Sequence, residues 1–179
     1  RHFTDLWPRP GCPTDGPRSM SSSRTSEAEL DAIMRIMAAA FDPQWGEAWT
    51  RPQVASALMM ANTHAALVDR VSQAPADPAD AVGFAIVRAA PGEEEILLIA
   101  VEPSLRRRGI GAELLATLAA NAHLRGAQRL FLEMRENNPA RSLYETHGFR
   151  PIGRRKNYYS IGDGARMDAI TFGLDIQPA

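Results

Sequence analysis

Hydrophobic and polar positions follow helical spacing at the start of the ordered part of the chain. A helix is predicted to begin near Ser26, because apolar residues recur every three or four positions after it. A second short helix is predicted after Thr50, which stands before Pro52 at a helix start, with Val54, Leu58 and Met59 facing inward. The apolar positions of the first helix are Leu30, Ile33, Met34, Met37 and Phe41.

Strand patterns follow in residues 64–69, 82–88 and 95–101. The last strand runs from Ile96 to Val101 without a polar residue, which predicts burial on both of its faces. Pro103 has no backbone donor for a strand ladder and therefore ends this strand.

The second half alternates helix and strand. A helix is predicted over 109–125, with Gly126 at its C-terminal stop, and a strand over 128–134. Asn138 is predicted to cap a helix with Pro139 at its first position and Gly148 at its end. Strands over 149–154 and 168–174 complete the chain, with a turn at Asp163-Gly164. The order predicts an α+β (mixed α/β) fold, one sheet with helices on both faces.

Residues 1–24 differ from the rest in being rich in proline, glycine and serine. Such a segment buries too little apolar surface to offset its ordering entropy, so we predict a disordered extension. Since the first methionine is Met20, we expect the natural start there. The predicted folded domain covers residues 25–176.

Composition excludes several function classes. The chain has 179 residues, a net charge of -1 and one cysteine. The small net charge gives no field toward a membrane or nucleic acid, and we expect neither as a partner. The lone Cys12 allows no intramolecular disulfide, which favours a cytoplasmic protein. No Cys/His pair has zinc-ligand spacing, so no metal is expected.

The segment from Arg106 to Ala112 reads Arg-Arg-Arg-Gly-Ile-Gly-Ala and joins a buried strand to a helix. A helix N-terminus offers free backbone N–H groups and a partial positive charge. Gly109 and Gly111 let an anion approach the backbone closely. The segment therefore predicts a pyrophosphate-binding turn. A dinucleotide-binding pattern is excluded, because Leu114 stands where the third glycine is required.

Residues 101–112 resemble the acetyl-CoA motif of the GNAT superfamily, Q/R-x-x-G-x-G/A behind a strand ending V-x-P. The resemblance implies a mostly antiparallel sheet, splayed beside a bulged strand, with acetyl-CoA in the gap. It also implies that Ile99, Ala100 and Val101 hold the pantetheine through their main chain. The residues that would hold the pyrophosphate are Arg106, Arg107, Arg108, Gly109, Ile110, Gly111 and Ala112.

Residues 132–149 resemble the second cofactor motif of this superfamily, N-x-x-A-x-x-L-Y-x-x-x-G-F, with Asn137 in the lead position. Residues 154–159 are similar to the ribosomal-protein-alanine N-acetyltransferases (the RimI group). Strand alternation separates Glu133 from its apolar neighbours at the end of a strand that flanks the gap. By this resemblance Glu133 is the general base and Tyr144 the general acid of a direct acetyl transfer. The Val101 N–H would meet the oxyanion.

Two departures from the RimI pattern stand out: the Glu133–Asn137 spacing is one residue short, and no strand is evident before the first helix. Glu94, Glu95 and Glu102 are alternative bases.

The resemblance implies that the acceptor is the N-terminal alanine of a small-subunit ribosomal protein. Its peptide would enter between residues 42–49 and 156–163, where aromatic side chains can line a groove. Two alternatives stay open: acetylation of a small amine such as an amino acid, polyamine or antibiotic, and a catalytically silent acetyl-CoA-binding module. The groove aromatics are Trp45, Trp49, Tyr158 and Tyr159.

Overall fold

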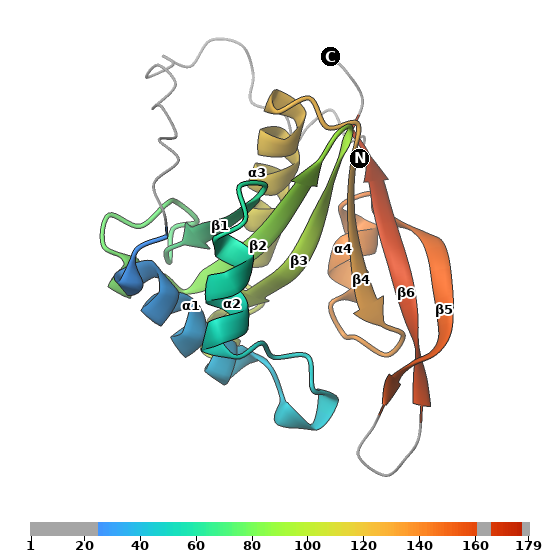
Figure 1. Ribbon diagram of the computed structural model, residues 1–179, viewed down its shortest axis with the longest axis horizontal. Coiled ribbons are helices and arrows are strands. Elements are labelled where there is room, and N and C mark those ends of the chain that lie inside the picture. The colour runs from blue at the N-terminus through green and yellow to red at the C-terminus, as the bar shows by residue number, and fades with distance from the viewer. Residues whose placement is uncertain (1–24, 161–165, 177–179) are drawn as a thin grey trace.

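Six strands form one sheet in the order β1-β2-β3-β4-β6-β5 (Figure 1). The computed structural model describes residues 25–160 and 166–176. All neighbouring strands are antiparallel except β3 and β4, which are parallel and joined by α3. The mostly antiparallel α+β fold is thus confirmed. The strands are β1 (Thr63–Val68), β2 (Gly83–Ala90), β3 (Glu93–Val101), β4 (Arg129–Arg135), β5 (Arg150–Ser160) and β6 (Arg166–Asp175).

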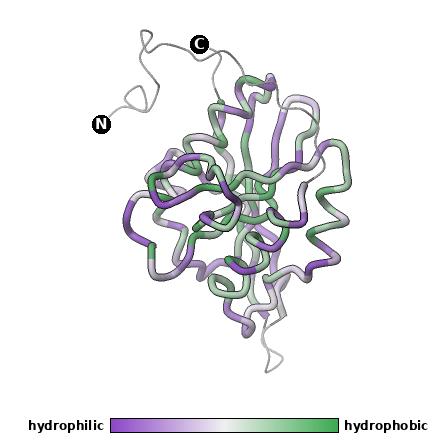
Figure 2. Tube along the Cα trace, turned by 90° about the vertical axis from the view of Figure 1, so that its left-hand side faces the viewer, coloured by the Kyte–Doolittle hydropathy of each residue, from purple (hydrophilic) through white to green (hydrophobic). Residues whose placement is uncertain are grey.

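Helices cover both faces of this sheet, as the sequence predicts. On one face α1 and α2 pack on strands β2 and β3, with Ile33, Ile36 and Val54 fully buried. On the other face α3 and α4 cover a larger apolar cluster. Hydrophobic segments accordingly run through the middle of the molecule (Figure 2). The helices are α1 (Glu27–Ala40), α2 (Arg51–Leu58), α3 (Ile110–Leu124) and α4 (Arg141–Thr146), with 3-10 turns η2 (Pro43–Trp45), η3 (Pro78–Asp80) and η4 (Pro103–Leu105).

Strand β3 contains a β-bulge at Leu97. Ile86 pairs with Leu98 and Val87 with Ile96, so Leu97 has no partner on β2. Ile96 packs into the cluster under α3, whereas both Leu97 and Leu98 pack toward α1 and α2. Two consecutive side chains on one face are the mark of an extra residue, which also bends the strand. The predicted burial on both faces is confirmed in part. Ile96 on one face and Leu98 and Ala100 on the other are buried, whereas the remaining residues of the run are half-buried.

The bulge coincides with the point where β3 and β4 part. Their parallel pairing covers only four residues of each strand, from Glu93 opposite Arg129 to Ile96 opposite Leu132. Beyond it both strands continue, and Figure 1 shows them diverging toward their C-terminal ends. The splayed sheet beside a bulged strand agrees with the expectation from the resemblance.

Some predicted boundaries are wrong. The last helix begins at Arg141 rather than after Asn138, because the Asn138 side chain accepts the Ala140 N–H at 2.9 Å and forms a turn first. Met59 is 83% exposed at the end of α2 and does not face inward. The start of α1 is as predicted, since Ser26 and Glu29 form a capping box.

The predicted disordered extension over 1–24 and the Asp163-Gly164 turn lie outside the described residues. Any strand that precedes α1 would also fall there. Within the described ranges, no helix is both long and apolar enough to cross a bilayer.

Candidate active site

The predicted phosphate-binding turn connects β3 to α3 through η4. Arg107 and Gly109 both have positive φ, at 64° and 87°, and Gly109 is the N-cap of α3. This left-handed conformation favours glycine at position 109. A Cβ built there would meet no atom within 4 Å, so the backbone faces open space. With no side-chain cap on α3, its first N–H groups are available to an anion.

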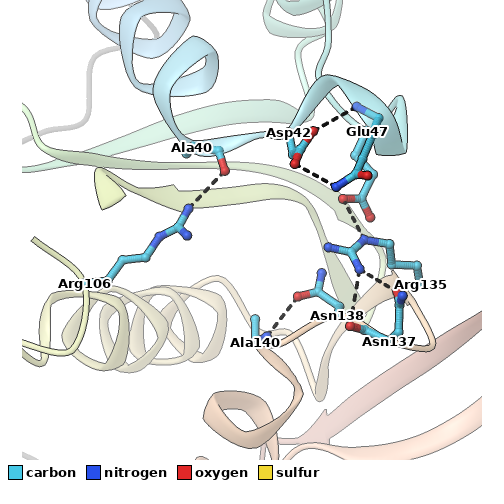
Figure 3. Close-up of polar contacts among 9 residues, drawn as sticks. Ala40, Asp42, Glu47, Arg106, Arg135, Asn137, Asn138 and Ala140 are labelled. Carbon is cyan, nitrogen blue, oxygen red and sulfur yellow. Dashed lines mark hydrogen bonds and ion pairs between the residues drawn. The ribbon is translucent and has the colours of Figure 1, made fainter. Parts of the chain in front are cut away.

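The three arginines of this turn have different surroundings. Arg106 donates from Nη2 to the Ala40 carbonyl at 3.0 Å (Figure 3). Its Nε donates to the Val101 carbonyl at 3.3 Å. Its side chain therefore ties the turn to the C-terminal end of α1. Arg107 and Arg108 are exposed. Their charges are the ones free to face a phosphate.

The open edge of β3 presents two of the three predicted main-chain sites. The Glu102 N–H donates to Val82 next to β2 at 2.8 Å. Because successive peptide groups of a strand point to opposite edges, Val101 and Ile99 turn theirs toward β4. The Ala100 carbonyl faces β2 instead: a Cβ added at Gly83 would lie 3.1 Å from it. Of the three residues predicted to contact pantetheine, Ile99 and Val101 thus remain candidates, and Ala100 does not.

Glu133 lies on β4 just beyond the last β3–β4 pair, opposite Thr171 of β6. Its carboxylate is 20% exposed and pairs with the Arg155 Nε of β5 at 3.2 Å. The Arg155 guanidinium in turn lies over the ring of Tyr158, 5.3 Å from its centroid. The candidate base therefore stands in the open part of the splay, within reach of solvent.

The three alternative carboxylates lie on β3 or directly after it, and each pairs with an arginine from another element. Glu94 is 2% exposed and takes a bidentate pair from Arg125, at 2.6 and 2.8 Å. Glu94 lies where β3 and β4 are still paired, at the end of β3 away from the turn. Glu95 pairs with Arg88, and Glu102 pairs with Arg35. These contacts favour a structural role for all three.

Tyr144 is 5% exposed on α4 and packs edge-on against Phe149, with ring centroids 5.9 Å apart. Burial raises the pKa of its phenol, and the negative charge of Glu47 raises it further. The group is therefore protonated at neutral pH, as a general acid must be.

Sequence reasoning missed Glu47 and Arg135. Arg135, the last residue of β4, pairs through Nε with Glu47 at 3.2 Å and lies 4.2 Å from the ring centroid of Trp45. It also donates to Asn137, the predicted cofactor residue, at both the side-chain and main-chain oxygens. No periodic pattern identifies either residue, since one lies in a loop and the other reads as an exposed strand end.

The predicted groove aromatics are divided between core and surface. Trp49 packs against the cluster under α1 and α2, and Trp45 stacks with Arg135. Tyr158 is 50% exposed and contacts Tyr159 edge-on. Burial, together with the charges of Glu47 and Glu133, raises the pKa of Tyr159 to about 12. This phenol therefore also belongs to the region around the two carboxylates.

Residues 76–151 match the acetyltransferase (GNAT) domain. The [ribosomal protein bS18]-alanine N-acetyltransferases of Haemophilus influenzae and Escherichia coli K12 are 40% and 42% identical to this chain over 89 and 94 residues. Those matches cover 50% and 52% of this chain but only 61% and 63% of the two relatives.

The structural comparison covers more of the chain. The crystal structure of the ribosomal-protein-S18-alanine N-acetyltransferase from Escherichia coli superimposes with a TM-score of 0.65 at 30% identity. It covers 88% of this chain and 94% of that protein. This similarity agrees with the bulged strand, the splay and the arginine-glycine turn described above. The chain belongs to the GNAT acetyltransferase superfamily.

Proposed function

We propose that this protein transfers the acetyl group of acetyl-CoA to the α-amine of an N-terminal alanine, carried by a small-subunit ribosomal protein. The observation that carries the proposal is the placement of two features on either side of one opening. The phosphate-binding turn ends β3, and Glu133 stands on β4 past the last strand pair. The names of the curated relatives support the choice of acceptor.

The residues around the opening between β3 and β4 suit acetyl-CoA, the proposed acetyl donor. The positive-φ turn at Gly109 with its exposed arginines suits the pyrophosphate. Ile99 and Val101 have main-chain groups at an edge that no strand occupies within the described residues, which suits the amides of pantetheine. Acetyl-CoA, when bound, supplies an activated thioester.

The chain's own groups then serve proton transfer. Glu133 accepts the proton that the acceptor amine gives up, since an α-amino group has a pKa of about 7.7–8.0 and needs only a modest base. Tyr144 keeps its proton at neutral pH and donates it to the departing thiolate. The Val101 N–H donates to the thioester oxygen as negative charge develops there.

The test compares two peptides with acetyl-CoA as donor. One begins with a free alanine amine, and the other has that amine blocked and its lysines free. Acetylation of the first peptide alone is the expected result. Failure of transfer to both would refute the proposal: activity on a small-amine panel would then assign a small-molecule enzyme, and acetyl-CoA binding without turnover would assign a silent module.

A further inference from the structure

The loop between α1 and α2 owes its shape to short-range contacts. Asp42 caps η2 by accepting the Gln44 N–H at 3.0 Å, and Gly46 ends this turn with φ of 62°. Thr50 then forms a capping box with Gln53 at the start of α2. These bonds fix the local path of the loop. They do not fix where Trp45 and Glu47 stand relative to β4.

Arg135 supplies that connection. Arg135 is 8% exposed. Its guanidinium contacts the Glu47 carboxylate at 3.2 Å and the oxygens of Asn137 (Figure 3). It also lies 4.2 Å from the centroid of the Trp45 ring. A planar fork that pairs and stacks simultaneously is specific to arginine, because the lysine ammonium is a single point charge.

The connection crosses the opening between the two halves of the sheet. The loop belongs to the half in which α1 and α2 cover β2 and β3. Arg135 ends β4, three residues past the last β3–β4 pair. Glu133 lies two residues before Arg135, and side chains at this spacing share one face of a strand. The loop is therefore held over the face that carries Glu133.

We propose that Arg135 is a positioning residue for the acceptor. It holds Trp45 and Glu47 at the mouth of the splay, the end where β3 and β4 have separated, and these two residues form the wall against which the peptide N-terminus binds. This inference rests on the proposed function. The charge of Glu47 raises the pKa of both Tyr144 and Tyr159, after burial, which agrees with a carboxylate close to the phenols around the mouth.

The first test is Arg135→Met, with the alanine peptide and acetyl-CoA varied separately. We expect the peptide KM to rise by about 10-fold or more, because the wall loses its anchor. The acetyl-CoA KM should rise much less, by about 2-fold, because Arg135 contacts the donor side only through its bonds to Asn137, a predicted cofactor residue. Arg129→Met is the matched control. Arg129 begins the same strand and pairs with Asp175 at 2.9 Å, at the end away from the mouth. Both KM values should stay unchanged in it.

Two further variants separate positioning from general instability. Arg135→Lys keeps the charge but not the planar fork, so its peptide KM should lie between those of the wild type and Arg135→Met. Glu47→Gln combined with Arg135→Met should cost less than the sum of the single changes, since both act on one contact. Hydrogen exchange of residues 42–49 should be faster in Arg135→Met than in the wild type, and this readout needs no activity.

The outcomes are distinct. An active wild type whose peptide KM and loop exchange are unchanged by Arg135→Met overturns the role of Arg135 and leaves the proposed function intact. A wild type that acetylates no peptide refutes the proposed function, and the acceptor role with it. A parallel rise of both KM values also overturns the proposal, because it indicates damage to the whole site.

Discussion

The buried pair of Glu94 and Arg125 gives a stability prediction that can be worked from the structure. Glu94 is 2% exposed and its carboxylate is held by Arg125, the C-cap of α3, through two short contacts. Arg125→Met would leave this carboxylate buried without its cation. Breaking a fully buried pair costs about 3–5 kcal/mol. Because the Arg125 side chain is 32% exposed, water can reach the site, and we expect about 2–3 kcal/mol.

Urea unfolding measures this loss directly, and thermal unfolding should show a Tm lower by roughly 4–12 °C for a domain of this size. The double variant Glu94→Leu/Arg125→Met has no buried charge left, so its stability should return to within about 1 kcal/mol of the wild type. The affinity for acetyl-CoA should hold in both, since the pair lies at the closed end of the splay. A single variant as stable as the wild type, or a double variant weaker than the single, would refute the reasoning.

Four further predictions concern the site and its surroundings. Glu133→Gln should lower kcat by about 100-fold or more near neutral pH, with acetyl-CoA affinity retained in a calorimetric titration; an unchanged kcat would remove it as the base. Gly111→Trp should abolish acetyl-CoA binding, whereas Gly111→Ala should keep it, because an added Cβ would lie 3.4 Å from Leu143, an ordinary contact. Tyr144→Phe should keep the fold and lower kcat by roughly 10–100-fold, and full activity would assign the acid role elsewhere. Burial, and after it the charge of Arg125, lowers the pKa of His64 in the folded state. The stability that comes from its neutral form is fully present above pH about 6.5 and is lost as pH falls through the folded-state pKa. When the pH is lowered from about 6.5 through that pKa, the Tm of His64→Asn should therefore fall less than the wild-type Tm.

Local patterns predicted most of the elements, because each helix and strand carries its own period and its own stop signals. Ser26 and Gly126 mark helix ends in the structure as they do in the sequence. The candidate phosphate-binding turn could be picked out for the same reason, since its arginines and glycines are contiguous.

Long-range features could not be predicted in this way. The bulge at Leu97 interrupts a run of uniformly apolar residues, so no change of side-chain character marks it. The contact of Glu47 with Arg135 joins residues 88 positions apart. Its two partners are ordinary surface residues by composition, and only the crossing of the loop over β4 gives them a common place.

The four-residue pairing of β3 and β4 has a consequence for how this architecture changes during evolution. Past Leu97, the edge of β3 that faces β4 offers main-chain N–H and C=O groups without a strand partner among the described residues. Every residue type except proline carries both groups, so substitutions along this edge leave the offered hydrogen bonds in place. A donor recognised there tolerates wide drift of side chains. On the proposed function, selection for a new acceptor can therefore act on the α1–α2 loop and the β5–β6 hairpin while the donor side stays unchanged.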